Sequence, residues 1–297
     1  MDCAKAVGAK AANPKKTIRQ LMGIFKVHCR IPLLVAVPTT AGTGSEVTLA
    51  AVLTDSEQGV KSPMYDFSLI PSVAVHDWTL TEHLPRSLTA TTGMDALTHA
   101  VEAYIGHTTS RYTREKIETC VTLIHKYLYR AYLNGSDQEA RQNMLTAAYC
   151  GGIALTQSYV GYIHGLAHAL GGLYGTPHGL ANSVIMPYFL KAYGGSAEKK
   201  LAKLARLIHE ADPKDPDGLA ASRFIAWVED MNRRMDIPRY IEGVDPKDFP
   251  FMAARADKES NPLYPVPKLM DKNVLEHMYC VVCGLDNSAG TERSGKP

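Results

Sequence analysis

The stretch HGLAHALGGLYGTPHGLAN, residues 164–182, combines three histidines with five glycines. His164 and His168 are four residues apart, so one helix presents both imidazoles on the same face. Packing alone does not require histidines at this density. Glycines permit sharp turns and close backbone approach around a bound group. The stretch therefore indicates a metal or ligand site, and the alternative is a set of core histidines hydrogen-bonded to the backbone.

The second half of this stretch predicts a turn between two helices. Gly171-Gly172 is expected to end the helix that carries the first two histidines. Pro177 suits the first position of a new helix, because its fixed φ and missing N–H cost nothing there. His178 is then expected at a helix start, folded back toward the earlier histidines.

A second polar pair lies in GMDALTHAVEAY, residues 93–104, where Asp95 precedes His99 by four positions. This spacing puts a carboxylate and an imidazole on one helical face, and Glu102 continues that face. Alone, the pair is equally typical of a contact on a helix surface. Together with the three histidines it predicts a site for a divalent transition ion, Fe(II) or Zn(II), which polarises a substrate oxygen.

The third signal is PTTAGTGSEVT, residues 38–48, in which five hydroxyl side chains surround two glycines after a strand end. Exposed N–H groups and hydroxyls of this kind bind phosphate or ribose. The segment matches neither the P-loop nor the dinucleotide fingerprint. Its alternative interpretation is an ordinary Gly-Thr turn.

Composition excludes several classes of protein. The chain has 297 residues, 45% of them hydrophobic, and a formal net charge of +2. This balance excludes bulk disorder and argues against a nucleic-acid surface or a polybasic membrane anchor. We find neither an apolar run of membrane-spanning length nor a signal-peptide core at the N-terminus.

Cys280 and Cys283 form a lone C-x2-C, interpreted as helix-packed thiols rather than a zinc site. We expect a cytoplasmic protein with reduced thiols.

The pattern along the chain predicts an α/β remnant followed by an all-α domain. Strands are expected within 32–40, 47–54 and 72–77, and helical spacing dominates from about residue 85, for example over 117–128. We place the boundary between 1–84 and 85–297. Three strands are too few to cover both faces of an α/β layer, so the first part is expected to be incomplete.

These segments, with NPLYPVPKLM (261–270), resemble the iron-containing (group III) alcohol dehydrogenase family, and they occur in the family's order. The resemblance implies the dehydroquinate synthase-like fold of that family. An N-terminal α/β domain, 1–84 here, binds a nicotinamide dinucleotide, and the helical domain 85–297 holds the catalytic metal.

The resemblance also assigns roles to individual residues. The implied ligands of Fe(2+), or of Zn(2+), are Asp95, His99, His164 and His178. His168 corresponds to a residue beside the substrate and the nicotinamide, and we assign it to proton relay or substrate contact. The implied contacts to NAD or NADP are Asp2, Thr39, Thr40, Thr48 and Lys61.

One departure concerns the beginning of the chain. The family carries a GGGS phosphate loop shortly before D-x-x-K, and Asp2 to Lys5 match only the latter part. The resemblance therefore implies that the first βαβ portion is missing. We expect metal binding to survive and tight dinucleotide binding to be lost.

The predicted function is a metal-dependent alcohol/aldehyde oxidoreductase using NAD(P), which acts on a small alcohol or aldehyde. We expect a homodimer with no nucleic-acid or membrane partner, because exposed strand edges favour pairing with another copy. One alternative is a non-redox metal enzyme similar to dehydroquinate synthase. Another is a non-catalytic, truncated paralogue that binds metal or a partner subunit, or a longer enzyme whose start codon is misassigned.

Overall fold

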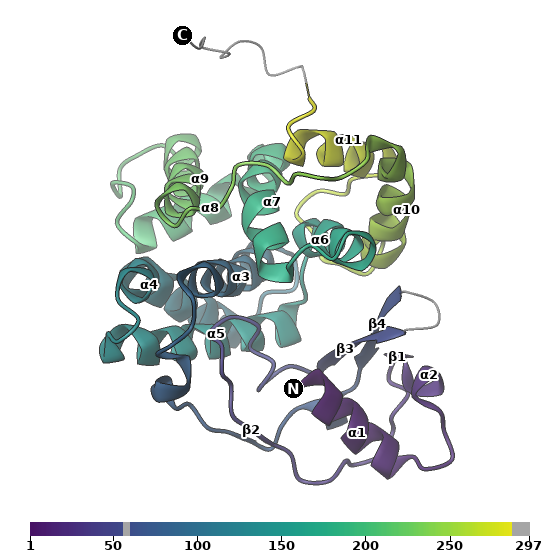
Figure 1. Ribbon diagram of the computed structural model, residues 1–297. Coiled ribbons are helices and arrows are strands. Elements are labelled where there is room, and N and C mark those ends of the chain that lie inside the picture. Colours follow the sequence, from purple (N-terminus) through teal and green to yellow (C-terminus); the bar gives the residue numbers. More distant parts are fainter. Residues whose placement is uncertain (56–59, 287–297) are drawn as a thin grey trace.

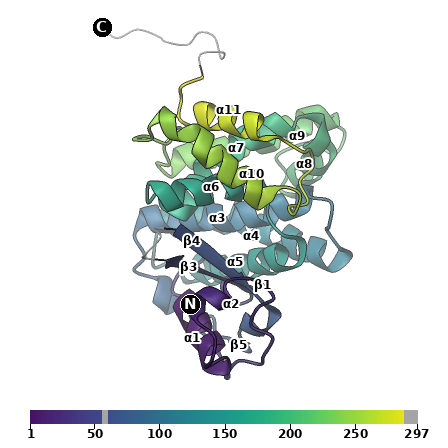
Figure 2. The same ribbon diagram turned by 90° about the vertical axis from the view of Figure 1, so that its right-hand side faces the viewer.

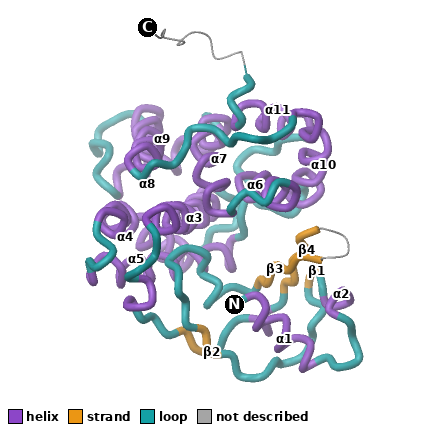
Figure 3. The backbone as a smooth tube through the Cα atoms, viewed as in Figure 1, coloured by secondary structure: helices purple, strands orange, loops and turns teal. Residues whose placement is uncertain are grey.

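A computed structural model describes residues 1–55 and 60–286, with side chains described outside 54–62. Two parts are stacked in Figure 1: the strands lie with α1 and α2 in the lower part, and helices α3 to α11 form the rest. Figure 3 shows the same division by secondary structure. This architecture confirms the predicted α/β remnant joined to a helical part. The exact boundary after residue 84 stays a prediction.

The lower part is built from short elements. They are α1 Asp2–Ala12, α2 Ile18–Leu21, β1 Gly23–Ile24, β2 Val35–Ala36, β3 Ala50–Asp55, β4 Val60–Tyr65 and β5 Val73–Ala74, with 3-10 turns at Phe67–Leu69 and Trp78–Thr81. One sheet has the order β1-β4-β3, with β3 antiparallel and β1 parallel to β4. A separate parallel pair joins β2 to β5.

The strands of the sequence prediction exist but are shorter than expected. Residues 32–40 contribute only the two-residue β2, and residues 72–77 only β5. Pro32 and Pro38 flank β2 and lack the N–H that a longer ladder requires. The buried core of the lower part is correspondingly small: Ala9, Leu21, Val27, Ala51, Met64 and Leu69. Val35 and Val73 of the β2–β5 pair are about half exposed.

The helical part surrounds α3. Its helices are α3 Arg86–Ile105, α4 Arg111–Leu133, α5 Gln138–Ser158, α6 Tyr162–Leu173, α7 His178–Tyr193, α8 Gly195–Leu207, α9 Asp217–Arg234, α10 Phe249–Ser260 and α11 Lys272–Val282, with a 3-10 turn at Pro246–Asp248. Figure 2 shows them layered above the strands. Every residue from Gly93 to Ile105 is buried, which is typical of a helix with no solvent-facing side.

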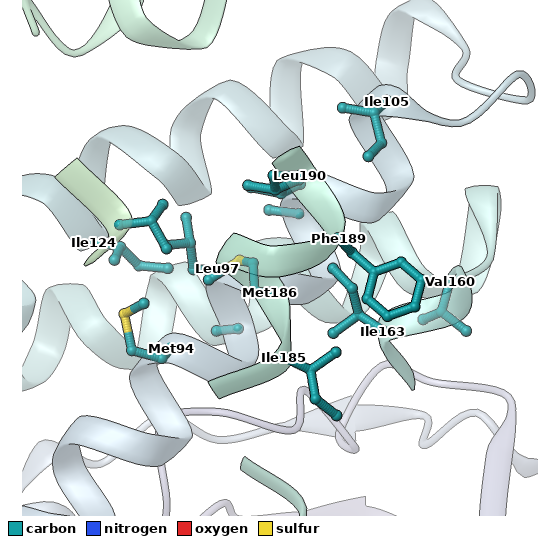
Figure 4. Packing of buried hydrophobic residues seen from close by; sticks show 14 of the residues in the cluster. Met94, Leu97, Ile105, Ile124, Val160, Ile163, Ile185, Met186, Phe189 and Leu190 are labelled. Carbon is teal, nitrogen blue, oxygen red and sulfur yellow. The ribbon is translucent and has the colours of Figure 1, made fainter. Parts of the chain in front are cut away.

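Apolar side chains fill the spaces between these helices. Figure 4 shows Met94 and Leu97 of α3, Ile124 of α4 and Met186 and Phe189 of α7 within one packed cluster. Burying each such side chain contributes about 1.5–3 kcal/mol. The core therefore holds α3 rigidly, together with the four polar side chains that its buried stretch carries.

The turn around residue 175 differs from the sequence prediction in detail. Helix α6 runs through Gly171-Gly172 to Leu173, because the Tyr174 N–H still bonds to the Leu170 carbonyl. Pro177 is the N-cap of α7, so His178 is its first residue. The expected pair of helices joined by a turn is confirmed, although the first helix ends later than predicted. Among the described residues, no helix has the length and apolar character needed to cross a bilayer.

Candidate metal centre

Four ionisable side chains from three helices meet beneath the α6–α7 turn. Asp95 and His99 are one turn apart on α3, His164 lies on α6, and His178 begins α7. Each offers one potential ligand atom, and these atoms lie within 4.8 Å of one another. The first three side chains are buried and His178 is half-buried. The structure thus brings together the four residues that the sequence proposed as metal ligands.

The spacing within this group suits one cation. Asp95 Oδ1 lies 3.6 Å from His178 Nε2 and 3.9 Å from His164 Nε2. A tetrahedral ion with bonds of about 2.0–2.1 Å separates its ligand atoms by about 3.4 Å. The rings of His99 and His164 are stacked with centroids 4.7 Å apart. Adjustments of a few tenths of an ångström to about one ångström therefore convert this group into a coordination sphere.

Asn182 reveals where such an ion would lie. Its Nδ2 donates to Asp95 Oδ1 at 2.7 Å and lies 3.1 Å from His164 Nε2 and 3.2 Å from His178 Nε2. An NH2 group has only two hydrogens, whereas three atoms with lone pairs converge on it. The buried Asn182 Oδ1 and His99 Nδ1 have no hydrogen-bond partner among the described residues. The residues present therefore fit a divalent cation at this point.

Burial keeps these imidazoles in the form that binds metals. Desolvation lowers the pKa of His99, although Asp95 opposes the shift. Desolvation also lowers the pKa of His164 well below its usual value, and the neighbouring histidines add to that effect. Both rings are consequently neutral near pH 7. A neutral ring nitrogen is the ligand that Fe(II) and Zn(II) accept.

Glu102 orients one of these rings from the far side. His164 Nδ1 lies 2.6 Å from Glu102 Oε2, and the Ile163 N–H donates to Oε1 at 2.9 Å. With Nδ1 occupied, His164 directs its Nε2 lone pair toward Asp95. Burial raises the pKa of Glu102 to about 8, against the opposing N–H groups of Gly161 and Ile163. A Cβ on Gly161 would lie 2.7 Å from Glu102 Oε1, so glycine is required there.

His168 lies beside the group but outside it. Its ring stacks on His178 with centroids 5.2 Å apart, and its Nδ1 lies 2.6 Å from Glu259 Oε1 on α10. Burial lowers the pKa of His168, but the charge and hydrogen bond of Glu259 outweigh burial and raise it. The structure thereby separates His168 from the four potential ligands.

Two adjoining cavities open from this region toward the strands. A narrow one of about 40 Å³ is lined by His168, Glu259, Arg255 and Tyr65, among others. A larger one of about 560 Å³ shares Tyr65 and Glu259 with it, and has a mainly apolar wall. That wall includes Ile24, Ala50, Leu155, Val160 and Leu263. The larger cavity therefore adjoins the narrow one that His168 lines, and neither lining includes a potential metal ligand.

Comparisons with known proteins identify the family of the chain. A model described as Fe-containing alcohol dehydrogenase family, C-terminal, matches residues 89–280, and one described as iron-containing alcohol dehydrogenase matches residues 1–78. The chain belongs to the iron-containing alcohol dehydrogenase family. Membership makes it an oxidoreductase by descent.

Two relatives of this family member illustrate its degree of similarity. It is 39% identical to 1,3-propanediol dehydrogenase of Klebsiella pneumoniae, over 88% of this chain and 67% of that one. It is 38% identical to NAD-dependent methanol dehydrogenase of Bacillus methanolicus, over 88% and 70%.

Solved structures extend the similarity to the fold. That of a 1,3-propanediol oxidoreductase matches with a TM-score of 0.90 and 36% identity, over 95% of this chain and 74% of that one. Sulfoacetaldehyde reductase of Bifidobacterium kashiwanohense, solved in complex with NAD+, matches at 0.83 with 26% identity, over 96% and 74%. The helical part with its small sheet therefore has the fold of iron-containing alcohol dehydrogenases.

In this member of the family, the residues proposed for the dinucleotide are spread over the lower part. Asp2 accepts hydrogen bonds from Ser45 Oγ at 3.3 Å and from the Val52 N–H at 3.1 Å. Thr39 is exposed and Thr40 half-buried on the turn after β2. Lys61 lies on β4, and its side chain falls outside the described residues. The contacts of these residues with a dinucleotide therefore stay a proposal.

Thr48 is bound by another side chain of the protein. Its carbonyl and Oγ1 accept hydrogen bonds from the buried Lys5 Nζ at 2.7 and 3.1 Å, and the Ala50 carbonyl accepts a third at 2.9 Å. Burial lowers the pKa of Lys5 to about 8, against the opposing charges of Asp2 and Glu46. Lys5 consequently ties α1 to the strand β3.

The Gly-Thr turn of 38–48 is held tightly against the helical part. Gly44 has φ of +57°, and a Cβ there would lie 2.5 Å from the Gly152 Cα on α5. Only glycine meets both demands. The turn is therefore fixed between the two parts of the molecule, near the larger cavity.

Four residues of the site were missed by sequence reasoning as functional groups: Lys5, Glu102, Asn182 and Glu259. Helical spacing offered a signal for two of them. Glu102 follows Asp95 by two turns, and Asn182 follows His178 by one turn, so each shares a face with a proposed ligand. Lys5 was noted only as part of the D-x-x-K motif, and Glu259 had no local signal because its partner His168 is distant in sequence.

Proposed function

We propose that this protein interconverts a primary alcohol and its aldehyde, with a divalent ion held by Asp95, His99, His164 and His178 and with NAD or NADP as the redox partner. The observation that carries the proposal is the convergence of Asp95 Oδ1, His164 Nε2 and His178 Nε2 on the single Asn182 amide. A divalent cation can accept lone pairs from all three atoms, whereas an amide NH2 group can donate to only two of them.

The reaction divides between bound groups and this chain. When bound, the ion and the nicotinamide supply Lewis-acid polarisation of the alcohol oxygen and a two-electron hydride acceptor. His168 takes the hydroxyl proton at Nε2, as the carbon–hydrogen bond gives up its electron pair as hydride. The apolar cavity binds the hydrocarbon part of the alcohol and excludes water. His168 afterwards returns the proton to solvent.

For the dinucleotide we propose contacts from Asp2, Thr39, Thr40, Thr48 and Lys61, supported by the family's motifs. The chain spans 67% of the length of the Klebsiella relative. We further propose cytoplasmic location, supported by six cysteines without disulfides, and homodimer formation, supported by the exposed valines of β2 and β5.

The test begins with metal content. Iron and zinc are measured on protein purified without oxygen, for the natural chain, for Asp95→Asn and for the surface control Asp230→Asn on α9. We expect about one ion per chain in the natural protein and the control, and a large loss in Asp95→Asn. Natural protein that binds neither metal would contradict the proposal.

Activity is then assayed with methanol, 1-propanol, 1,3-propanediol and 1-butanol, using NAD+ and NADP+ at millimolar concentration. Hydride transfer with at least one pair, abolished in Asp95→Asn, is the expected result. A metal-loaded protein with no oxidation of any alcohol would instead favour the non-redox alternative. Micromolar dinucleotide affinity would contradict the expectation of weak binding.

A further inference from the structure

Glu259 on α10 connects His168 to a second side chain. Its Oε1 lies 2.6 Å from His168 Nδ1 and accepts a hydrogen bond from Tyr264 OH at 2.7 Å. Glu259 and His168 are both about one-third exposed. The three residues form a chain of contacts that runs from α6, across the last turn of α10, to the segment after it.

This contact determines which nitrogen of His168 carries hydrogen. An ionised carboxylate can only accept, so Nδ1 must be the donor. In the neutral imidazole, Nε2 is then the ring nitrogen that offers a lone pair.

The remaining nitrogen has no competing partner. Among the described residues, no hydrogen bond engages His168 Nε2, while the ring stacks on His178 at 5.2 Å and borders the narrow cavity. The ring is thus clamped from one side by Glu259 and from one face by a proposed metal ligand.

We propose that Glu259 is a positioning residue of this reaction, which holds His168 in the Nδ1–H form so that Nε2 receives the substrate proton. This inference rests on the proposed function. As the alcohol O–H bond breaks, the Nε2–H bond forms, and the resulting imidazolium keeps its Nδ1–H hydrogen bond to the carboxylate. Tyr264 holds the accepting oxygen in place.

The competing explanation is structural: the same contact joins α6 to α10, and its loss would loosen the helical part. The two explanations differ in how the variants combine. If Glu259 acts through His168, replacing Glu259 lowers kcat no further once His168 has been removed. If its role is purely structural, the fold-losses in kcat of the two single variants multiply in the double variant.

The experiment is a double-mutant cycle of Glu259→Leu and His168→Ala in the metal-loaded protein, with kcat and KM measured at saturating dinucleotide. Tyr264→Phe is the milder third variant. We expect Glu259→Leu to lower kcat about 100-fold with little change in KM. In the His168→Ala background it should change kcat less than about twofold. Multiplicative losses, or a loss of bound metal and helicity in Glu259→Leu, would overturn the positioning role.

A second readout does not depend on turnover. Imidazole nitrogen NMR of histidine-labelled, zinc-loaded protein should find His168 protonated at Nδ1 in the natural chain, and a mixture of both tautomers in Glu259→Leu. An unchanged His168 signal in the variant would overturn the inference. Absence of any alcohol oxidation by the natural protein, with the expected NMR change, would contradict the proposed function while leaving the Glu259–His168 relationship intact.

Discussion

Asn182 Nδ2 lies 2.7 Å from Asp95 Oδ1, at the point on which the nitrogens of His164 and His178 also converge. The amide stands where a cation would bind, and it is a weaker substitute because it offers two hydrogens to three acceptors. Binding of an ion requires this side chain to move aside. The stability that Asn182 contributes should therefore depend on whether the site holds an ion.

Replacing Asn182 by alanine should destabilise the metal-free protein more than the metal-loaded one. Without metal, the variant leaves buried acceptors without their shared donor, at a cost of about 1–3 kcal/mol. With metal bound, those acceptors are ligands and the amide is dispensable. Thermal unfolding with and without Zn(2+) should therefore show a larger metal-induced rise in Tm for Asn182→Ala. An equal rise in both proteins would contradict this account.

Glu102→Gln should weaken metal binding about 10–100-fold without removing a ligand, because partners that orient a coordinating imidazole contribute on this scale. Competition with a zinc-sensitive dye measures the affinity directly. Glu115→Gln on the exposed face of α4 is the matched control and should bind metal normally. Unchanged affinity in Glu102→Gln would exclude the proposed role of the His164–Glu102 contact.

Gly161→Ala should impair both stability and metal affinity, since its Cβ would lie 2.7 Å from Glu102 Oε1. The comparison variant is Gly172→Ala within α6, where a Cβ meets nothing within 4 Å. Alanine there should stabilise the helix by up to about 1 kcal/mol. Chemical unfolding and metal titration of the pair measure both effects. Equal behaviour of the two variants would show that crowding at residue 161 is unimportant.

The buried Lys5 should give the protein a pH-dependent stability at alkaline pH. Its pKa is lowered from 10.5 to about 8 in the folded chain, so between these values the unfolded chain binds more protons. Unfolding free energy consequently rises with pH across this window, by about 3 kcal/mol in total. Below pH 8 the lysine is charged in both states and this gain is absent.

The measurement compares the natural chain with Lys5→Met by chemical unfolding at pH 7.5, 9 and 10.5. Subtracting the unfolding free energy of the variant from that of the natural chain cancels the contribution of the tyrosines and cysteines that both proteins contain. The stability of the natural chain relative to the variant should increase with pH. A difference that is constant across the range would mean that Lys5 titrates normally.

Much of the helical part was predictable because its signal is local. Helical spacing over 117–128 agrees with α4, which extends from Arg111 to Leu133. The strands were harder to predict, because a strand's length depends on which partner it finds. Residues 32–40 look like one strand in sequence, yet only Val35–Ala36 pair, with β5 across a long connection.

The sequence by itself determined the residue types of the centre and their one-turn pairs, since spacing along a helix is set by the backbone. Spacing alone left open which histidines join Asp95, and the tertiary structure shows the physical basis of the division that the family resemblance implied. His178 joins the group and His168 is drawn away by Glu259, 91 positions further along the chain. Glu102 and Asn182 likewise meet partners 62 and 87 positions distant. No periodicity encodes such contacts, because they arise from the packing of α3, α6, α7 and α10 around a common core.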